Sequence, residues 1–178
     1  SLLRAADILR ENGLRRPFVI ASRRQCADEH FRALQEKLDE QDILLSIFSS
    51  VEPNPSVETV EKIAAQYKID SCDCFLVIGG GSPMDAAKAA AARLARPDKP
   101  LSQLVGVLKV RRRIPPLIAV PTTAGPGSEP PLAAVVTGSD HHKYAISDLC
   151  LIPRYAILDP ALTVGLPPHI TAETGMDA

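Results

Sequence analysis

The regular alternation of short apolar runs with amphipathic segments limits the fold of this chain more than any other feature. Short apolar runs, typical of buried parallel strands, occupy residues 18–21, 43–48, 75–78, 117–120 and 155–158, with Ser46 as the single polar residue. Helical spacing of apolar residues is found at residues 2–12, 25–39, 56–68 and 83–95. Strands that alternate with helices predict an α/β fold with a doubly wound, mostly parallel, Rossmann-like sheet.

The second half of the chain adds a different pattern. Residues 132–137 and 143–147 are expected to form the arms of an added β-hairpin, joined by Gly138-Ser139-Asp140. Residues 171–178 have the pattern of a helix that is only beginning where the sequence stops. Because a domain rarely ends inside an element, we expect the sequence to be part of a longer protein.

Bulk composition excludes several classes of function. Lys and Arg number 20 and Asp and Glu 21, so a net charge of −1 gives no electrostatic attraction to nucleic acid or to a membrane surface. No apolar run is long enough to span a bilayer, and the first residues lack the apolar core of a secretion signal. Four cysteines in 178 residues do not make a disulfide framework, so we expect a cytoplasmic protein.

A glycine turn follows the apolar run at 75–78. Gly79-Gly80-Gly81-Ser82 leads into an alanine-rich helix, with Ser82 expected as N-cap and Asp85 as the third helical residue. Three glycines let a ligand approach the backbone closely, and the N–H groups and dipole of the helix favour an anion such as phosphate. A purely structural turn is the alternative. The spacing is neither G-x-G-x-x-G nor that of a P-loop, so neither of those nucleotide motifs is present.

A second polar cluster runs from Pro121 to Glu129, directly after the apolar run at 117–120. A loop after a parallel strand lies at the carboxyl edge of the sheet, where open α/β folds bind ligands. The adjacent hydroxyls of Thr122 and Thr123 suit a phosphate or a ribose. The alternative, a Pro/Gly loop whose hydroxyls bond to their own backbone, stays open at this point.

Taken together, the two clusters resemble the iron-containing (group III) alcohol dehydrogenase family. The family's GGGS-x-x-D-x-A-K turn matches Gly79 to Lys88, and its P-T-T-x-x-x-G-S-E loop matches Pro121 to Glu129. Further matches are A-I-L-D-P at 156–160, L-P-P at 166–168 and T-G-M-D-A at 174–178. The resemblance covers the N-terminal half of the family. It implies a dinucleotide-binding α/β domain at 1–165 and the start of a truncated helical metal-binding domain at 166–178.

The resemblance also implies which residues bind the cofactor, NADP or NAD. Those assigned to the pyrophosphate and the nicotinamide side are Gly79, Gly80, Gly81, Ser82, Asp85, Thr122 and Thr123. Asn54 would approach the adenosine half, Lys143 would reach the ribose, and Leu162 would pack near the ribose or adenine. No residue is assigned a catalytic role, because a metal polarises the alcohol oxygen and the cofactor accepts the hydride.

Asp177 matches the first of four metal ligands, one Asp and three His, in which the first His lies four residues after the Asp. Only Ala178 follows here, and a lone carboxylate is a poor Fe²⁺ site because several N and O ligands must act together. We therefore expect Fe²⁺ to bind only in the full-length enzyme, and this fragment alone to be inactive. Pro126 departs from the family, which usually has Thr there, and proline offers neither a hydroxyl nor an N–H.

The segment A-S-R-R at 21–24 bears on the choice between the two cofactors. NAD-preferring members usually carry an Asp after the first strand to bind the ribose hydroxyls, and Ser22 aligns with that position. Without a carboxylate there, a 2′-phosphate is not repelled, and Arg23 or Arg24 can pair with it. The alternative is that both arginines are solvated residues of the next helix. We hypothesise a preference for NADP, or use of both cofactors.

The function implied by the resemblance is an NAD(P)-dependent oxidoreductase that interconverts an alcohol and an aldehyde or ketone. Its partners would be the nicotinamide dinucleotide, a small alcohol or aldehyde, and a second copy of itself in a homodimer. A glycerol-dehydrogenase-like or dehydroquinate-synthase-like relative is an alternative that the P-T-T-x-x-x-G-S-E loop disfavours. A non-catalytic nucleotide-binding module is the other alternative.

Overall fold

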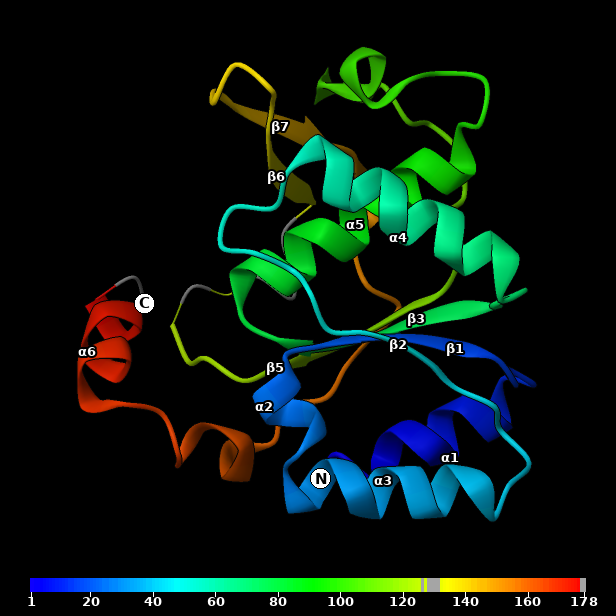
Figure 1. The fold of residues 1–178 in the computed structure, drawn as a ribbon, viewed down its shortest axis with the longest axis vertical. Helices are drawn as coiled ribbons and strands as arrows, with labels where there is room; N and C mark the ends of the chain where they lie inside the picture. Colours follow the sequence, from blue (N-terminus) through cyan, green and yellow to red (C-terminus); the bar gives the residue numbers. More distant parts are fainter. Residues whose placement is uncertain (126, 128–131, 177–178) are drawn as a thin grey trace.

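The computed structural model describes residues 1–125, 127 and 132–176. Its centre is a five-stranded, wholly parallel sheet with the strand order β2-β1-β3-β5-β8 (Figure 1). The strands are β1 (Pro17–Ala21), β2 (Ser46–Phe48), β3 (Cys74–Gly79), β5 (Leu117–Pro121) and β8 (Tyr155–Ala156). After β2 the chain returns to the other side of β1, so the sheet is doubly wound and the predicted α/β fold is confirmed.

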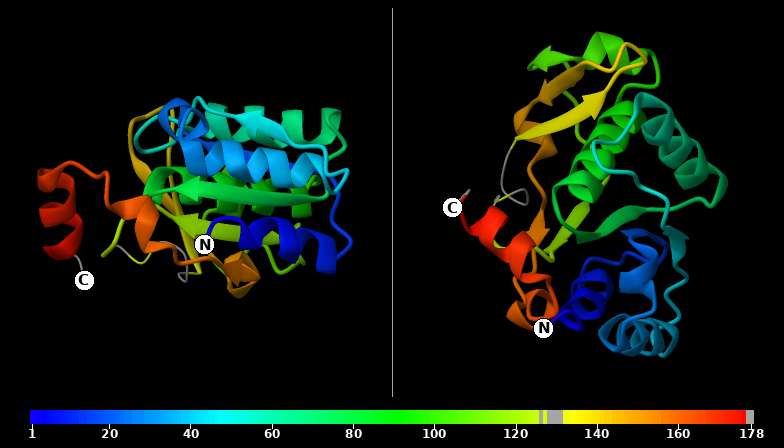
Figure 2. Two further views of the ribbon diagram at one scale, coloured as in Figure 1. Left: turned by 90° about the horizontal axis from the view of Figure 1, so that it is seen from below. Right: turned by 60° about the vertical axis from the view of Figure 1, so that its left-hand side comes forward.

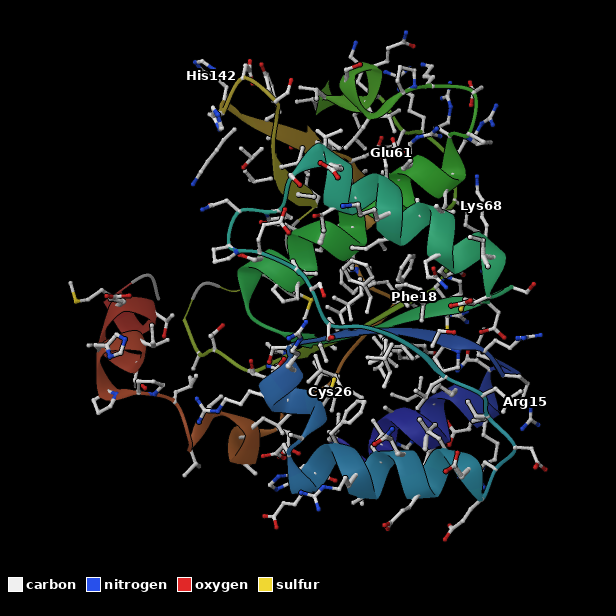
Figure 3. All side chains as sticks on the ribbon, in the orientation of Figure 1. Arg15, Phe18, Cys26, Glu61, Lys68 and His142 are labelled. Carbon is white, nitrogen blue, oxygen red and sulfur yellow. The ribbon has the colours of Figure 1, made fainter. Side chains whose placement is uncertain are left out.

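Helices cover both faces of this sheet (Figures 1 and 2). They are α1 (Arg4–Glu11) and α3 (Glu29–Asp39) on one face, and α4 (Val57–Ile69) and α5 (Gly81–Ala95) on the other. The side chains of β1 alternate between the two layers: Phe18 and Ile20 pack with α4 and α5 (Figure 3), and Val19 and Ala21 pack with α1 and α3. Every residue of β1 is therefore buried, which explains its unbroken apolar run.

The alanine content of α5 follows from its position between two sheets. One side of α5 packs on the main sheet and α4, and the other side packs on a small second sheet (Figure 1). The strands of the second sheet are β4 (Gly106–Val107), β7 (Lys143–Ser147) and β6 (Ala133–Thr137), in that order. Strands β6 and β7 form the predicted antiparallel hairpin. Six alanines between positions 86 and 92 are wholly buried, because only a methyl group fits where the layers approach so closely.

Several element boundaries differ from the sequence prediction. The helix expected at 25–39 is split into α2 (Arg23–Cys26) and α3, because the Asp28 carboxylate accepts a hydrogen bond from the His30 backbone N–H and caps a new helix. The strands expected at 43–48 and 155–158 are shorter, and the last helix, α6 (Pro168–Met176), begins before residue 171. Short 3₁₀ helices are η1 (Leu101–Leu104), η2 (Leu149–Leu151) and η3 (Pro160–Thr163).

All four cysteines are free thiols. Cys26 on α2 packs against the apolar cluster between the sheet and α3 (Figure 3). Among the described residues, no helix combines the length and the apolar character that crossing a membrane requires.

Candidate functional site

The carboxyl ends of β1, β3 and β5 bring three separate segments of the chain together. Parallel pairing sets Ala21 beside Ile78, and Gly79 beside Pro121. The segments that follow these strands therefore begin side by side (Figure 1). They are α2, the glycine turn (Gly79–Ser82) and the P-T-T loop, whose described part is residues 121–125. This edge is where open parallel sheets bind ligands, as the sequence predicted.

The N-terminus of α5 has no side-chain cap. Gly80 occupies the N-cap position, and no side chain there bonds the first amides of the helix. The prediction that Ser82 is the N-cap is therefore wrong, because Ser82 is already the second residue of the helix. Its Oγ instead accepts a hydrogen bond from the Asn54 backbone N–H at 3.3 Å. Uncapped amides together with the helix dipole suit an anion at this end of α5.

Close packing leaves little room for a side chain at two positions of the turn. A Cβ on Gly79 would lie 2.7 Å from Pro83 Cγ, and a Cβ on Gly80 would lie 3.2 Å from Thr123 Cγ2. The Thr122 backbone N–H also donates to the Gly79 carbonyl oxygen at 3.1 Å. The glycine turn and the P-T-T loop therefore form one packed unit.

Gln25 ties the first turn of α2 to this unit. Its Oε1 accepts from the Ser22 backbone N–H at 2.8 Å, and the Ser22 Oγ accepts from the Gln25 backbone N–H at 3.2 Å. Its Nε2 donates to Thr122 Oγ1 at 3.0 Å. The S-x-x-Q spacing is a capping-box signal, so the helix cap could have been found from the sequence. The bond to Thr122, 97 positions away, could not.

A cavity of about 290 Å³ opens beside the packed unit. Ser22, Thr122 and Leu162, three of the predicted cofactor residues, line it, whereas Arg23 does not. A larger hollow of about 730 Å³ lies between the start of α4, η1 and the tip of the hairpin. None of the predicted cofactor residues lines this larger hollow, so the smaller cavity is the better candidate site.

Charged side chains lie along the wall of the smaller cavity. Arg24 lines it in place of Arg23, and its Nη2 donates to the Gly165 carbonyl oxygen at 3.2 Å. His30 Nδ1 lies 2.8 Å from Asp28 Oδ1, and this hydrogen bond raises the pKa of His30. The pKa of Asp28 is lowered by two hydrogen bonds, the more effective one from the His30 backbone N–H and the other from the His30 ring. The Asp28 carboxylate is therefore bonded to His30. Among the described residues, the Arg24 guanidinium hydrogen-bonds only the neutral Gly165 carbonyl.

The hairpin links Asn54 and Lys143 to the glycine turn. Thr137 donates through its backbone N–H to the Pro55 carbonyl oxygen at 2.8 Å and through Oγ1 to the Asn54 carbonyl oxygen at 3.1 Å. Lys143 lies opposite Thr137 in the β6–β7 register. Because the Asn54 N–H in turn bonds Ser82 Oγ, the hairpin and the glycine turn are joined through two hydrogen-bonded steps.

Asp85 lies one turn further along α5 than the glycines. Burial raises the pKa of its carboxyl to about 6, against the lowering effects of a hydrogen bond from the Val135 backbone N–H and the charges of Lys88 and Lys143. This hydrogen bond joins α5 to β6. The contact of Asp85 with a pyrophosphate stays a prediction.

The predicted metal ligand Asp177 lies outside the described residues, as do Pro126 and Glu129 of the P-T-T loop motif. Within the described part of the chain, no group of three His, Cys, Asp or Glu side chains is placed to hold a metal ion. The described residues therefore do not by themselves fit Fe²⁺.

Fold and site together define an open, parallel α/β domain with a glycine turn and a hydroxyl-bearing loop packed at the carboxyl edge of its sheet. A family model described as iron-containing alcohol dehydrogenase matches residues 1–160. The chain belongs to the iron-containing alcohol dehydrogenase family, and the resemblance carried by the sequence motifs is confirmed.

Individual relatives agree with this membership. The 4-hydroxybutyrate dehydrogenase of Cupriavidus necator is 37% identical over 171 residues, which are 93% of this chain and 44% of the relative. A crystal structure of 1,3-propanediol oxidoreductase has a TM-score of 0.92 at 30% identity, over 99% of this chain and 46% of that chain. Sulfoacetaldehyde reductase from Bifidobacterium kashiwanohense, solved in complex with NAD+, has a TM-score of 0.83 at 34% identity. The match covers 99% of this chain and 46% of that chain. The chain spans less than half the length of these relatives.

Proposed function

We propose that this chain forms the cofactor-binding half of an oxidoreductase that interconverts an alcohol and an aldehyde or ketone with NADP or NAD. One observation carries the proposal. The glycine turn and the P-T-T loop pack together at the uncapped N-terminus of α5, beside a cavity of about 290 Å³. Family membership and the dehydrogenase activities named for the relatives support it.

Each part of a dinucleotide has residues suited to it. The pyrophosphate would take the N–H groups of Gly81 and Ser82, since Pro83 has none, together with hydroxyls of the P-T-T loop. The ribose and adenine would occupy the cavity between Ser22 and Leu162. When bound, the nicotinamide ring carries the hydride, and the task of this chain is to hold and orient the cofactor. Fe²⁺ belongs to the proposal through the family alone and only for the full-length enzyme.

For the choice of cofactor we propose NADP, or use of both. Ser22 carries no charge to repel a 2′-phosphate, and its Oγ is occupied by the helix cap. The sequence left open whether Arg23 or Arg24 pairs with that phosphate. Arg24 lines the cavity, and we assign the pairing to its guanidinium.

Calorimetric titration of the full-length protein with NADP and with NAD tests these proposals. We expect both to bind, and Arg24→Ala to weaken NADP binding about ten-fold or more, with little effect on NAD. Arg23→Ala removes the same charge away from the cavity and is the matched control. Failure of both dinucleotides to bind the wild type overturns the proposed function. If Arg24→Ala and Arg23→Ala weaken NADP binding equally, or if the wild type strongly prefers NAD, only the NADP assignment is overturned.

The domain boundary at residues 165 and 166, the homodimer and the cytoplasmic location stay predictions. Limited proteolysis, sedimentation and fractionation of the full-length protein test them in turn.

A further inference from the structure

The side-chain amide of Gln25 is held in one orientation by two different partners. The Ser22 backbone N–H can only donate, so the atom that faces it at 2.8 Å is the amide oxygen of Gln25. The amide nitrogen consequently faces Thr122 Oγ1 at 3.0 Å. Because an amide nitrogen can only donate, Thr122 Oγ1 accepts in this bond and its own proton is not used.

The Thr122 hydroxyl proton therefore remains available to a ligand. No described residue accepts a hydrogen bond from this hydroxyl. Thr122 itself is 8% exposed, and it lines the cavity together with Ser22 and Gln25. Its backbone is fixed as well, since its N–H donates to the Gly79 carbonyl oxygen. The position of the hydroxyl oxygen is thus set before a ligand arrives, and the bond from Gln25 keeps the hydroxyl proton away from the side that faces Gln25.

We propose that Gln25 is a positioning residue that fixes the Thr122 hydroxyl as a hydrogen-bond donor to a phosphate oxygen of the bound dinucleotide. A phosphate oxygen only accepts, so it needs a hydroxyl whose proton is free. This inference rests on the proposed function, and it adds to that function a residue outside both sequence motifs that controls affinity.

The amide is the chemical group that this role requires. A Glu at position 25 would still complete the capping box, because its carboxylate accepts from the Ser22 N–H as well as an amide does. It would, however, accept the Thr122 proton instead of donating to Thr122 Oγ1. The hydroxyl would then present only lone pairs to the cavity and would repel a phosphate oxygen.

Gln25→Glu is therefore the decisive variant, in a double-mutant cycle with Thr122→Val. We expect Gln25→Glu to weaken NADP and NAD binding about ten-fold or more by calorimetry, with an unchanged melting temperature because the cap is retained. In the Thr122→Val background the same substitution should cost at most a few-fold, the part due to its charge. Thr122→Ser keeps a hydroxyl and should keep the full effect of Gln25→Glu.

Salt separates orientation from simple charge repulsion and does not depend on the folding of the Thr122 variants. In about 1 M salt, charges are screened beyond roughly 3 Å, so an affinity ratio of wild type to Gln25→Glu that persists supports the proposal. Two outcomes overturn this inference while the wild type still binds cofactor. One is that Gln25→Glu has the same effect on affinity in the wild type and in Thr122→Val. The other is that the affinity ratio of wild type to Gln25→Glu falls to one in high salt. A wild type that binds neither dinucleotide overturns the proposed function and this inference together.

Discussion

Replacing Asp85 with Asn tests whether burial of this carboxyl destabilises the folded chain. The pKa of Asp85 is about 6 in the folded protein against an ordinary value of 3.8. Between these values the folded chain keeps a proton that the unfolded chain has released. The free energy of unfolding therefore falls as the pH rises from about 4 to about 6, and the loss is complete above that window.

The size of the effect follows from the shift. About two pKa units correspond to about 3 kcal/mol at roughly 1.36 kcal/mol per unit. Asp85 is only partly buried, and solvent screening reduces this to about 1–2 kcal/mol. Asn keeps an oxygen that accepts from the Val135 N–H and carries no charge. We expect Asp85→Asn to be more stable than the wild type by about 1–2 kcal/mol at pH 8, and equally stable at about pH 4.

Urea unfolding followed by circular dichroism at pH values from 4 to 8 measures the effect. The difference between the two proteins at each pH removes the contribution of titrating groups that Asp85 does not contact. Asp98→Asn is the control of opposite sign, because a hydrogen bond from Arg96 lowers the pKa of exposed Asp98 to about 2. This variant should be less stable than the wild type by an amount that does not change between about pH 4 and pH 8. For Asp85→Asn, a stability difference that is constant with pH, or a wild type that is the more stable at pH 8, would refute the reasoning.

Three further substitutions probe packing and buried hydrogen bonds, the first two at the candidate site and the third away from it. Gly79→Ala should destabilise the fold by about 1–3 kcal/mol in urea unfolding, because its Cβ would lie 2.7 Å from the rigid Pro83 ring, and adding Pro83→Ala should recover part of the loss. Gly80→Ala should lower dinucleotide affinity about ten-fold by calorimetry with a small change in melting temperature, because its methyl displaces Thr123, 3.2 Å away, from the ligand side. Asp148→Ala should cost about 3 kcal/mol in urea unfolding, because this buried carboxylate accepts hydrogen bonds from three backbone amides. Burial alone would raise the pKa of Asp148, but the hydrogen bonds lower it below the ordinary value. The stability that Asp148 contributes is therefore lost as the pH falls below the ordinary Asp range.

Local sequence patterns were sufficient to predict most elements and the edge at which the site lies. Unbroken apolar runs predicted parallel strands, and parallel strands place the segments after them at one edge. That rule alone brings the turn at Gly79 and the loop at Thr122 to the same side of the sheet. It does not specify that β3 and β5 are neighbours, which is what puts Gly79 within hydrogen-bonding distance of Thr122.

The details that failed depend on geometry that no short pattern contains. Ser82 has the chemistry of an N-cap, but the cap lies two residues earlier, because Gly80 takes the extended cap conformation and the helix begins at Gly81. Whether Arg23 or Arg24 lines the cavity depends on the rotation of α2 about its axis, and that is set by the Ser22–Gln25 cap. Long-range pairs such as Gln25 with Thr122 arise only when strand order and helix rotation are both fixed.

The P-T-T loop is also the place where the α/β domain meets the last helix. Gly125 has φ +131°, and a Cβ there would overlap the Thr174 carbonyl oxygen of α6. The two backbones therefore touch without room for a side chain. Helix α6 buries none of its residues and stands apart from the main sheet (Figure 2), and this contact joins it to the P-T-T loop. Since the bonds of Thr122 to Gly79 and Gln25 hold the same loop, the glycine turn, α2 and α6 all contact one short segment of the chain.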